Sequence, residues 1–249
     1  MSQRNKFEIA EKIIISLSSK LRTFKNESSE LIQFIRELES INFSLTHELT
    51  ATKHPSNAFL ALLNSIHLNF CNKLIDDLDH KNLAEFTWMN IYDGLETNQL
   101  FINGMFVSRL LGLDGYFASN RISVGLMLIM PGVTYPFHTH IVKEFYYCLS
   151  GKLFIQHDID GEMFSLGEGE ISITPEGKLH SLEVIGNKPV LLVYSWLGDL
   201  NAPIRIWEKM KSGSWDGCIW RRLPGQKWKR SDLQKLSNKD FLNLFSKYS

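Results

Sequence analysis

The stretch of sequence that decides the fold reads GVTYPFHTHIVKE and runs from Gly132 to Glu144. His138 and His140 are two residues apart, so on an extended strand both imidazoles point to the same face. Glu144 follows after a short bend, and His180 arrives from a separate segment. The pattern predicts a small β-barrel over about residues 120–200, in which three imidazoles and one carboxylate hold a single metal ion.

This set of nitrogen and oxygen ligands suits several divalent ions. Imidazole and carboxylate groups both bind first-row transition metals, so the cofactor we expect is one ion of Fe, Mn, Zn, Ni or Co. The four ligands alone do not choose among these metals. A chain that had kept the ligands but lost the metal would have the same sequence pattern here.

The spacing around the ligands is typical of one family of barrels. The segments match G-x5-H-x-H-x3-E-x6-G and then G-x5-P-x-G-x2-H, the two signatures of the cupins. The residues that meet them are Gly132, His138, His140, Glu144, Gly151, Gly169, Pro175, Gly177 and His180. The sequence therefore resembles a cupin, which implies a mainly β protein built on a small jelly-roll barrel. His157 lies outside both signatures, and we assign it no role as a ligand.

The chain ahead of the barrel has helical periodicity. Apolar residues recur at helical spacing in two stripes, which are Phe7, Ile14, Leu17 and Leu21, then Leu31, Phe34, Ile35 and Leu38. A longer helix is predicted to begin at the N-cap Ser56 and to carry Phe59, Leu63, Ile66, Phe70 and Leu74 on one face. We expect an α-helical N-terminal region over residues 1–118.

The following part of the chain has the residue composition and turn spacing of a β-protein. Short β-branched and aromatic runs alternate with glycine-containing turns. The predicted strands are Ser123–Met130, Glu144–Leu149, Leu153–His157, Glu162–Ser165, Glu170–Thr174, Ser181–Ile185 and Val190–Trp196. We expect a cupin barrel with the metal site over residues 119–203. Residues 204–249 then form a C-terminal extension that ends in a helix over Ser231–Tyr248.

Composition excludes several classes of function. The 249 residues contain 27 Lys and Arg and 27 Asp and Glu, so no net charge attracts nucleic acid or a membrane. Five basic residues and two tryptophans lie between Trp220 and Arg230, and we interpret them as a solvated loop packed on the barrel. No apolar run approaches the ~18 residues of a membrane span. Three dispersed cysteines and the absence of a secretory signal predict a cytoplasmic protein.

Two tyrosines flank the predicted ligands. Tyr135 precedes His138 by three residues, and Tyr146 shares a strand face with Glu144. A phenol has a pKa of about 10, which a nearby divalent cation lowers. Such a tyrosine could remove a proton next to a carboxylate that the metal polarises. The alternative is that both tyrosines are core aromatic residues.

With these tyrosines the sequence resembles the cupin-type dimethylsulfoniopropionate (DMSP) lyases. The matching elements are Tyr135-Pro-Phe-His138-Thr-His140, Glu144-Phe-Tyr146 and Tyr194-Ser-Trp196-Leu-Gly198-Asp199-Leu200. The resemblance implies a metal-dependent carbon–sulfur lyase that splits DMSP, a small zwitterionic carboxylate, into dimethyl sulfide and acrylate by β-elimination. Cupins also commonly form homodimers.

The resemblance further implies roles for single residues. The metal would bind the substrate carboxylate, Tyr146 would remove the α-proton, and Tyr135 would position the substrate or assist. Trp196, on the same strand face as Tyr194, is the candidate for contact with the sulfonium, since cations bind aromatic faces. A plug at the barrel end is the alternative for Trp196. Two other functions stay open, an Fe(II)-dependent cupin dioxygenase and a non-catalytic cupin that binds a small carboxylate.

Overall fold

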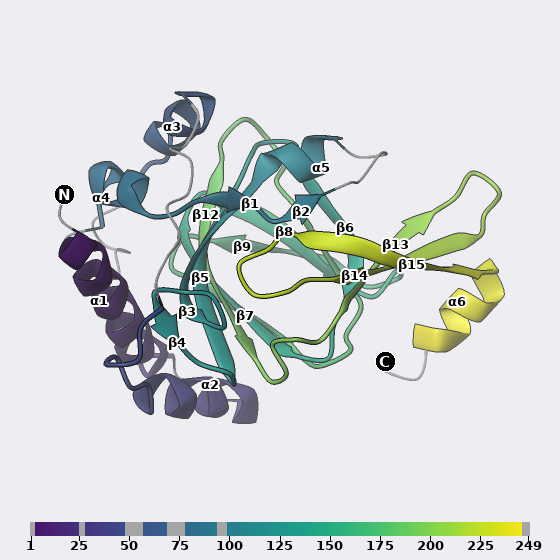
Figure 1. The fold of residues 1–249 in the computed structure, drawn as a ribbon. Coiled ribbons are helices and arrows are strands. Elements are labelled where there is room, and N and C mark those ends of the chain that lie inside the picture. The colour runs from purple at the N-terminus through teal and green to yellow at the C-terminus, as the bar shows by residue number, and fades with distance from the viewer. Residues whose placement is uncertain (1–2, 25–27, 48–56, 69–77, 94–98, 246–249) are drawn as a thin grey trace.

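A computed structural model of the chain describes residues 3–24, 28–47, 57–68, 78–93 and 99–245. In this part, two mainly antiparallel sheets form a barrel, and helices cover one side of it (Figure 1). The helices are α1 (Gln3–Leu21), α2 (Ser29–Glu39), α3 (Asn57–Asn64), α4 (His80–Glu85), α5 (Gln99–Gly104) and α6 (Asn238–Phe245). The predicted mainly β architecture with a helical N-terminal region is confirmed.

The first sheet has the strand order β1-β3-β5-β12-β7-β10, with β4 paired to β3. Its strands are β1 (Met89–Asn90), β3 (Met105–Gly112), β4 (Phe117–Ala118), β5 (Ile122–Ile129), β7 (Lys143–Ser150), β10 (Ile171–Thr174) and β12 (Val190–Leu197). The second sheet has the order β2-β15-β14-β13-β6-β11-β8-β9. Its strands are β2 (Tyr92–Asp93), β6 (Thr134–Thr139), β8 (Lys152–His157), β9 (Met163–Gly167), β11 (His180–Glu183), β13 (Ile204–Lys209), β14 (Trp215–Arg221) and β15 (Trp228–Leu236).

All seven predicted strands are present, with ends shifted by no more than two residues. Strands also occur on both sides of residues 119–203, because β1 to β4 precede that stretch and β13 to β15 follow it. The sheets therefore extend beyond the segment that carries the cupin signatures.

Two helix predictions need correction. The helix over Ser231–Tyr248 is wrong for its first six residues, which belong to β15 and pair with β14 along their length. The helix α6 begins only at Asn238, where the Ser237 hydroxyl accepts a hydrogen bond from the Asp240 amide at 3.1 Å. The helix near Phe59 ends at Asn64, since the next residues are not helical. Ser56, Phe70, Leu74 and Tyr248, the last residue of the predicted C-terminal helix, lie outside the described residues.

The N-terminal helices cover the outer face of the first sheet. Both predicted apolar stripes form helices, and their residues pack in one core with the outward side chains of β7. The ring of Phe34 in α2 lies 5.7 Å from that of Phe145 in β7. The neighbouring Glu144 and Tyr146 point the other way, into the barrel. The helical layer thus supports the strand that carries the site without reaching the site itself.

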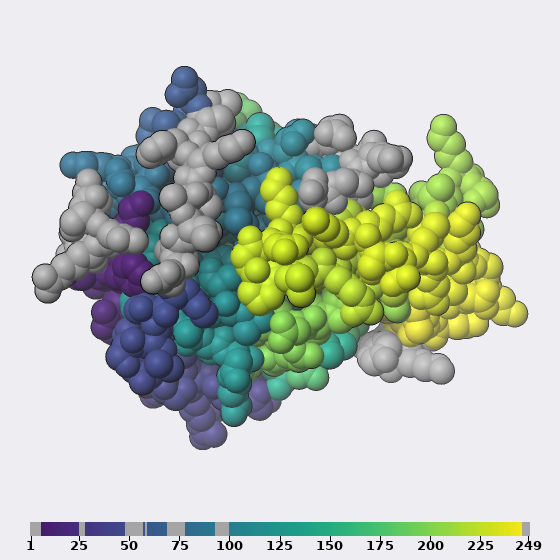
Figure 2. Space-filling model, viewed as in Figure 1, coloured from purple at the N-terminus to yellow at the C-terminus, as the bar shows by residue number. Residues whose placement is uncertain are grey.

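The C-terminal strands extend to one side of the barrel and carry α6 at their end (Figure 1). In the space-filling view, this yellow segment runs across the face of the molecule and projects beyond the rest (Figure 2). A separate aromatic core stabilises it, in which Trp215 stacks on Phe241 with ring centroids 4.0 Å apart. None of the described helices has the length and apolar character needed to cross a membrane.

Replacing Phe34 by Ala should lower the free energy of unfolding by about 3–5 kcal/mol, because it removes a fully buried ring between α2 and β7. Chemical denaturation followed by circular dichroism measures this change. The control is Arg36→Ala on the exposed side of the same helix, which should change stability by less than about 0.5 kcal/mol. Equal effects of the two substitutions would contradict the packing of α2 on the sheet.

Candidate metal centre and adjoining pocket

The four predicted ligands come together inside the barrel. Their nearest ligand atoms all lie within 4.8 Å of one another, and all four side chains are buried. His138 lies on β6, His140 directly follows β6, Glu144 lies on β7 and His180 on β11. The register accounts for the convergence across the long sequence gap, because His180 is the direct partner of His138 in the β6–β11 pair.

Each imidazole is oriented by the backbone. The Nδ1–H groups of His138, His140 and His180 donate to the carbonyl oxygens of Pro136, Val142 and Lys178 at 2.8, 2.9 and 2.8 Å. With its proton on Nδ1, each neutral ring carries a lone pair on Nε2. Such a hydrogen bond from the second ring nitrogen is the usual support of a metal-binding histidine.

The Glu144 carboxylate is the centre of this group. Its Oε2 lies 3.3 Å from Nε2 of His140 and 3.0 Å from Nε2 of His180. Burial alone raises the pKa of this carboxyl, but His140 and His180 outweigh burial and hold it well below its usual range. Nitrogen and oxygen at these distances need a proton or a metal cation between them, and the four ligand atoms face one another closely enough to share a cation. The four residues therefore fit a divalent metal ion.

The indole of Trp196 contacts two of the ligands. Its Nε1–H donates to Oε1 of Glu144 at 2.5 Å, and its ring centroid lies 4.9 Å from that of His140. The strand register brings this about, because Trp196 on β12 is the direct partner of Glu144 on β7. Trp196 thus orients the carboxylate as well as lining the pocket beside it.

Tyr135 packs against the imidazole of the ligand His138. Its ring stacks on His138 with centroids 3.8 Å apart, and its hydroxyl is hydrogen-bonded to the hydroxyl of Tyr92. Burial, followed by the neighbouring Tyr92, raises the pKa of Tyr135 well above its usual value. Sequence reasoning missed Tyr92, which belongs to the short strand β2 and to no motif.

Tyr146 points into the barrel next to the carboxylate. Its side chain is fully buried, and among the described residues its hydroxyl has no partner at good hydrogen-bond geometry. Burial, followed by the negative charge of Glu144, raises the pKa of Tyr146 well above its usual value. Glu144 is near enough to act on this hydroxyl, but no well-formed hydrogen bond satisfies it, which is uncommon for a buried group and requires an explanation.

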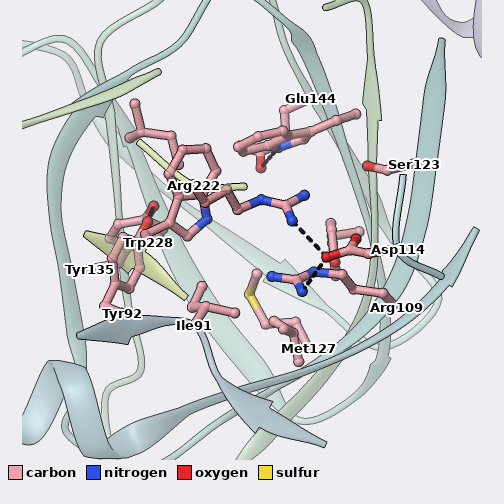
Figure 3. Close-up of a pocket in the computed structure, with 14 residues that line it drawn as sticks. Ile91, Tyr92, Arg109, Asp114, Ser123, Met127, Tyr135, Glu144, Arg222 and Trp228 are labelled. Carbon is pink, nitrogen blue, oxygen red and sulfur yellow. Dashed lines mark hydrogen bonds and ion pairs between the residues drawn. The ribbon is translucent and has the colours of Figure 1, made fainter. Parts of the chain in front are cut away.

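A pocket opens beside the metal centre (Figure 3). Glu144, Trp196 and Tyr135 form one end of it, and Tyr194 lines it as well. The opposite end is polar and was not predicted from sequence. It consists of two arginines that share one carboxylate, namely Arg109, Arg222 and Asp114.

His157 lies near the site but is not one of the ligands. Its ring centroid is 6.4 Å from that of His180, and its Nε2 lies 3.3 Å from the Thr174 hydroxyl. Burial and the neighbouring His180 lower the pKa of His157 to about 4. This residue provides a matched control for the ligand histidines.

Known proteins share both the sequence pattern and the fold. The sequence profile of the dimethylsulfoniopropionate lyase family matches residues 26–192. The DMSP lyase DddQ of Ruegeria pomeroyi is 29% identical over 119 residues, which cover 47% of this chain and 58% of that protein. Gentisate 1,2-dioxygenase from a Ralstonia species is 28% identical over 135 residues, which cover 49% of this chain and 36% of that enzyme. The chain thus matches little more than half the length of DddQ, and less of the dioxygenase.

Solved structures with the same fold include DMSP lyases. The crystal structure of DddQ from Ruegeria pomeroyi matches with a TM-score of 0.55 at 20% identity, over 77% of this chain and 94% of that one. A crystal structure from work on the DMSP lyases RdDddP and RnDddQII matches with a TM-score of 0.61 at 18% identity, over 83% and 100%. At these identities the structures establish the fold alone.

The barrel and the converging ligands define the protein as a cupin with a candidate metal centre, as the two signatures predicted. The family profile covers more than half of the chain. The chain therefore belongs to the dimethylsulfoniopropionate lyase family.

Replacing His180 by Ala should remove a metal ligand. We expect metal affinity to fall by more than the roughly 10- to 100-fold that loss of a residue supporting a ligand costs. Metal analysis after dialysis measures the bound ion, and added metal should raise the melting temperature of the unchanged protein but not that of the His180→Ala protein. The control His157→Ala should keep its metal. A His180→Ala protein with a full equivalent of metal would refute this ligand set.

Proposed function

We propose that the protein is a metal-dependent lyase that cleaves DMSP to dimethyl sulfide and acrylate by β-elimination. The observation that carries the proposal is the buried hydroxyl of Tyr146, which lacks a well-formed partner and lies beside the candidate metal centre. Membership of the DMSP lyase family supports the choice of substrate.

The proposed reaction begins with Tyr146. Its phenolate oxygen takes the proton from the carbon next to the substrate carboxylate, and the C–H electron pair becomes the new carbon–carbon double bond. The bond between carbon and sulfur breaks, and its electron pair leaves with dimethyl sulfide. The products are acrylate and a protonated Tyr146, which returns its proton to solvent before the next turnover.

Because its pKa is raised, Tyr146 can act as the base only where a nearby positive charge favours its phenolate form. A phenol whose pKa burial and Glu144 raise is a poor base at neutral pH. A divalent ion on the four ligands would supply a Lewis acid for the substrate carboxylate and a positive charge that favours the phenolate. Closure of the barrel around Tyr146 keeps water from competing for the same proton.

The other predicted residues receive supporting roles. Tyr135 is held by Tyr92 and by the stack on His138, so it can position the substrate rather than act as a freely exchanging base. The ring centroids of Trp196 and Trp228 are 6.1 Å apart, and both residues line the pocket. Aromatic faces of this kind suit a sulfonium, which has no hydrogen-bond donors. Tyr194 lines the same pocket and is the second candidate for substrate contact.

Protein loaded with each of the five candidate metals in turn should release dimethyl sulfide from DMSP. Gas chromatography of the headspace measures the product, and chelator-treated protein is the control. No release above that control with any of the metals would refute the proposed activity.

Replacing Tyr146 by Phe should lower kcat by at least about 100-fold, because it removes the proposed base and leaves the ring in place. Metal content should stay at the level of the unchanged protein. The matched control is Tyr147→Phe, since Tyr147 lies on the opposite face of β7 and packs with the helices. Retained turnover in the Tyr146→Phe protein would exclude this residue as the base.

An Fe(II)-dependent cupin dioxygenase is the second candidate, and the similarity to gentisate 1,2-dioxygenase favours it. Oxygen separates the two functions, because an elimination proceeds anaerobically and a dioxygenase requires O2. A non-catalytic cupin that binds a small carboxylate would give no product under either condition.

A further inference from the structure

One buried carboxylate joins two parts of the chain that are far apart in sequence. Asp114 lies between β3 and β4, and its Oδ2 accepts hydrogen bonds from Arg109 and Arg222 at 2.7 and 2.8 Å. The Gly225 amide donates to the same oxygen at 2.7 Å. The Asp114 side chain is 8% exposed, and each arginine side chain is 10% exposed. Hydrogen bonds between charged groups are strong, and salt screens them little when they are buried.

Asp114 is the main support of the turn between β14 and β15, which comprises residues 222–227. The turn is exposed from Leu223 to Gln226. Its own backbone contributes one hydrogen bond, from the Gln226 amide to the Leu223 carbonyl at 3.0 Å. Among the described residues, Asp114 is the one side chain outside the turn that hydrogen-bonds to it. The position of the turn therefore depends on Asp114.

The turn leads directly into Trp228, which lines the pocket. The Trp228 amide donates to the Ile91 carbonyl at 2.7 Å, so the backbone of this residue is held next to β2. Its ring is supported by Arg222, whose guanidinium carbon lies 5.3 Å from the ring centroid. Figure 3 shows the guanidinium of Arg222 between Trp228 and Asp114. Asp114 thus fixes the group that supports the indole.

These contacts continue to the candidate metal centre. The ring centroids of Trp228 and Trp196 lie 6.1 Å apart, and the Trp196 indole donates to Oε1 of Glu144 at 2.5 Å. Asp114, Trp228, Trp196 and Glu144 all line the same pocket. A displaced Trp228 ring would therefore change the shape of the pocket, while every metal ligand would stay in place.

We propose that Asp114 is a positioning residue for the substrate pocket. It holds the turn and Arg222 in place, and Arg222 holds the Trp228 ring against which the substrate packs. Asp114 acts through these two residues and not on the reacting atoms, so its loss weakens substrate binding more than it slows the chemical step. The proposal rests on the proposed function only for the identity of the substrate, because these contacts require neither the metal nor a reaction.

Steady-state kinetics of DMSP cleavage by the metal-loaded protein provide the first test. Asp114→Asn keeps an acceptor oxygen but loses the charge, so it weakens the bonds to both arginines. We expect KM to rise about fivefold or more and kcat to stay within about twofold, which is the pattern of lost uniform binding. Asp114→Glu keeps the charge and should recover part of the affinity. The matched control is Asp232→Asn, since Asp232 is exposed on β15 of the same hairpin.

Hydrogen–deuterium exchange tests the same link without any reaction. In chelator-treated, full-length protein, the amides of residues 222–227 should exchange faster in Asp114→Asn than in the unchanged protein, and those of β7 should not. Arg222→Gln is the second variant, because it leaves Arg109 and Asp114 as a balanced buried pair. It should also raise KM, since the Trp228 ring loses its support. Thermal melting shows which variants are folded.

Unchanged KM and unchanged exchange of the turn in folded Asp114→Asn protein would overturn the proposal. A fall in kcat at constant KM would overturn it as well, because Asp114 would then act on the reaction itself. If Asp114→Asn does not fold, an unchanged KM in folded Arg222→Gln protein decides against the proposal. Absence of DMSP cleavage by the unchanged protein would instead refute the proposed function, and faster exchange of the turn in Asp114→Asn would still support the positioning role.

Discussion

The buried carboxylate of Glu144 is the constraint around which the site is arranged. An ionised carboxyl inside a barrel is strongly unfavourable unless hydrogen bonds or positive charge compensate both of its oxygens. Here the Trp196 indole satisfies Oε1, while His140 and His180 face Oε2. These partners come from β12, from β11 and from the residue after β6, so the register of β12 on β7 and that of β11 on β6 together determine whether Glu144 can be buried at all.

Alternate side chains of β7 point to opposite faces of the sheet, so one face of the strand carries site residues and the other packs against the helices. Glu144, Tyr146 and Cys148 face the barrel, whereas Phe145 and Tyr147 face the helices. A shift of one residue in register would exchange the two sets and place the site residues against α2. The aromatic packing on the outer face therefore stabilises the one register in which the ligands meet. Burial and the nearby Glu168 raise the pKa of the Cys148 thiol to about 12, so this inward-facing thiol stays protonated at neutral pH.

The metal centre could be predicted from sequence because its signals are local. His138, His140 and Glu144 lie within seven residues, and the period of two along an extended segment places the two histidines on the same face. Tyr92, Arg109 and Arg222 could not be predicted, since they meet only through pairings of strands far apart in the chain, such as the parallel pair of β2 with β15. The helix predicted from Ser231 was wrong for the same reason, because pairing with β14 outweighs local periodicity.

The family profile ends at residue 192, and several residues of the pocket lie beyond it, namely Tyr194, Trp196, Ile204, Arg222 and Trp228. The metal ligands and Tyr146 all fall inside the matched stretch. The candidate metal centre is thus encoded wholly within the matched stretch, whereas one side of the pocket depends on residues that follow it. The hairpin of β14 and β15 contributes Arg222 and Trp228 to the pocket. Changing the turn between these strands should therefore change which ligands the pocket binds without altering the metal ligands, and directed evolution can begin at this hairpin.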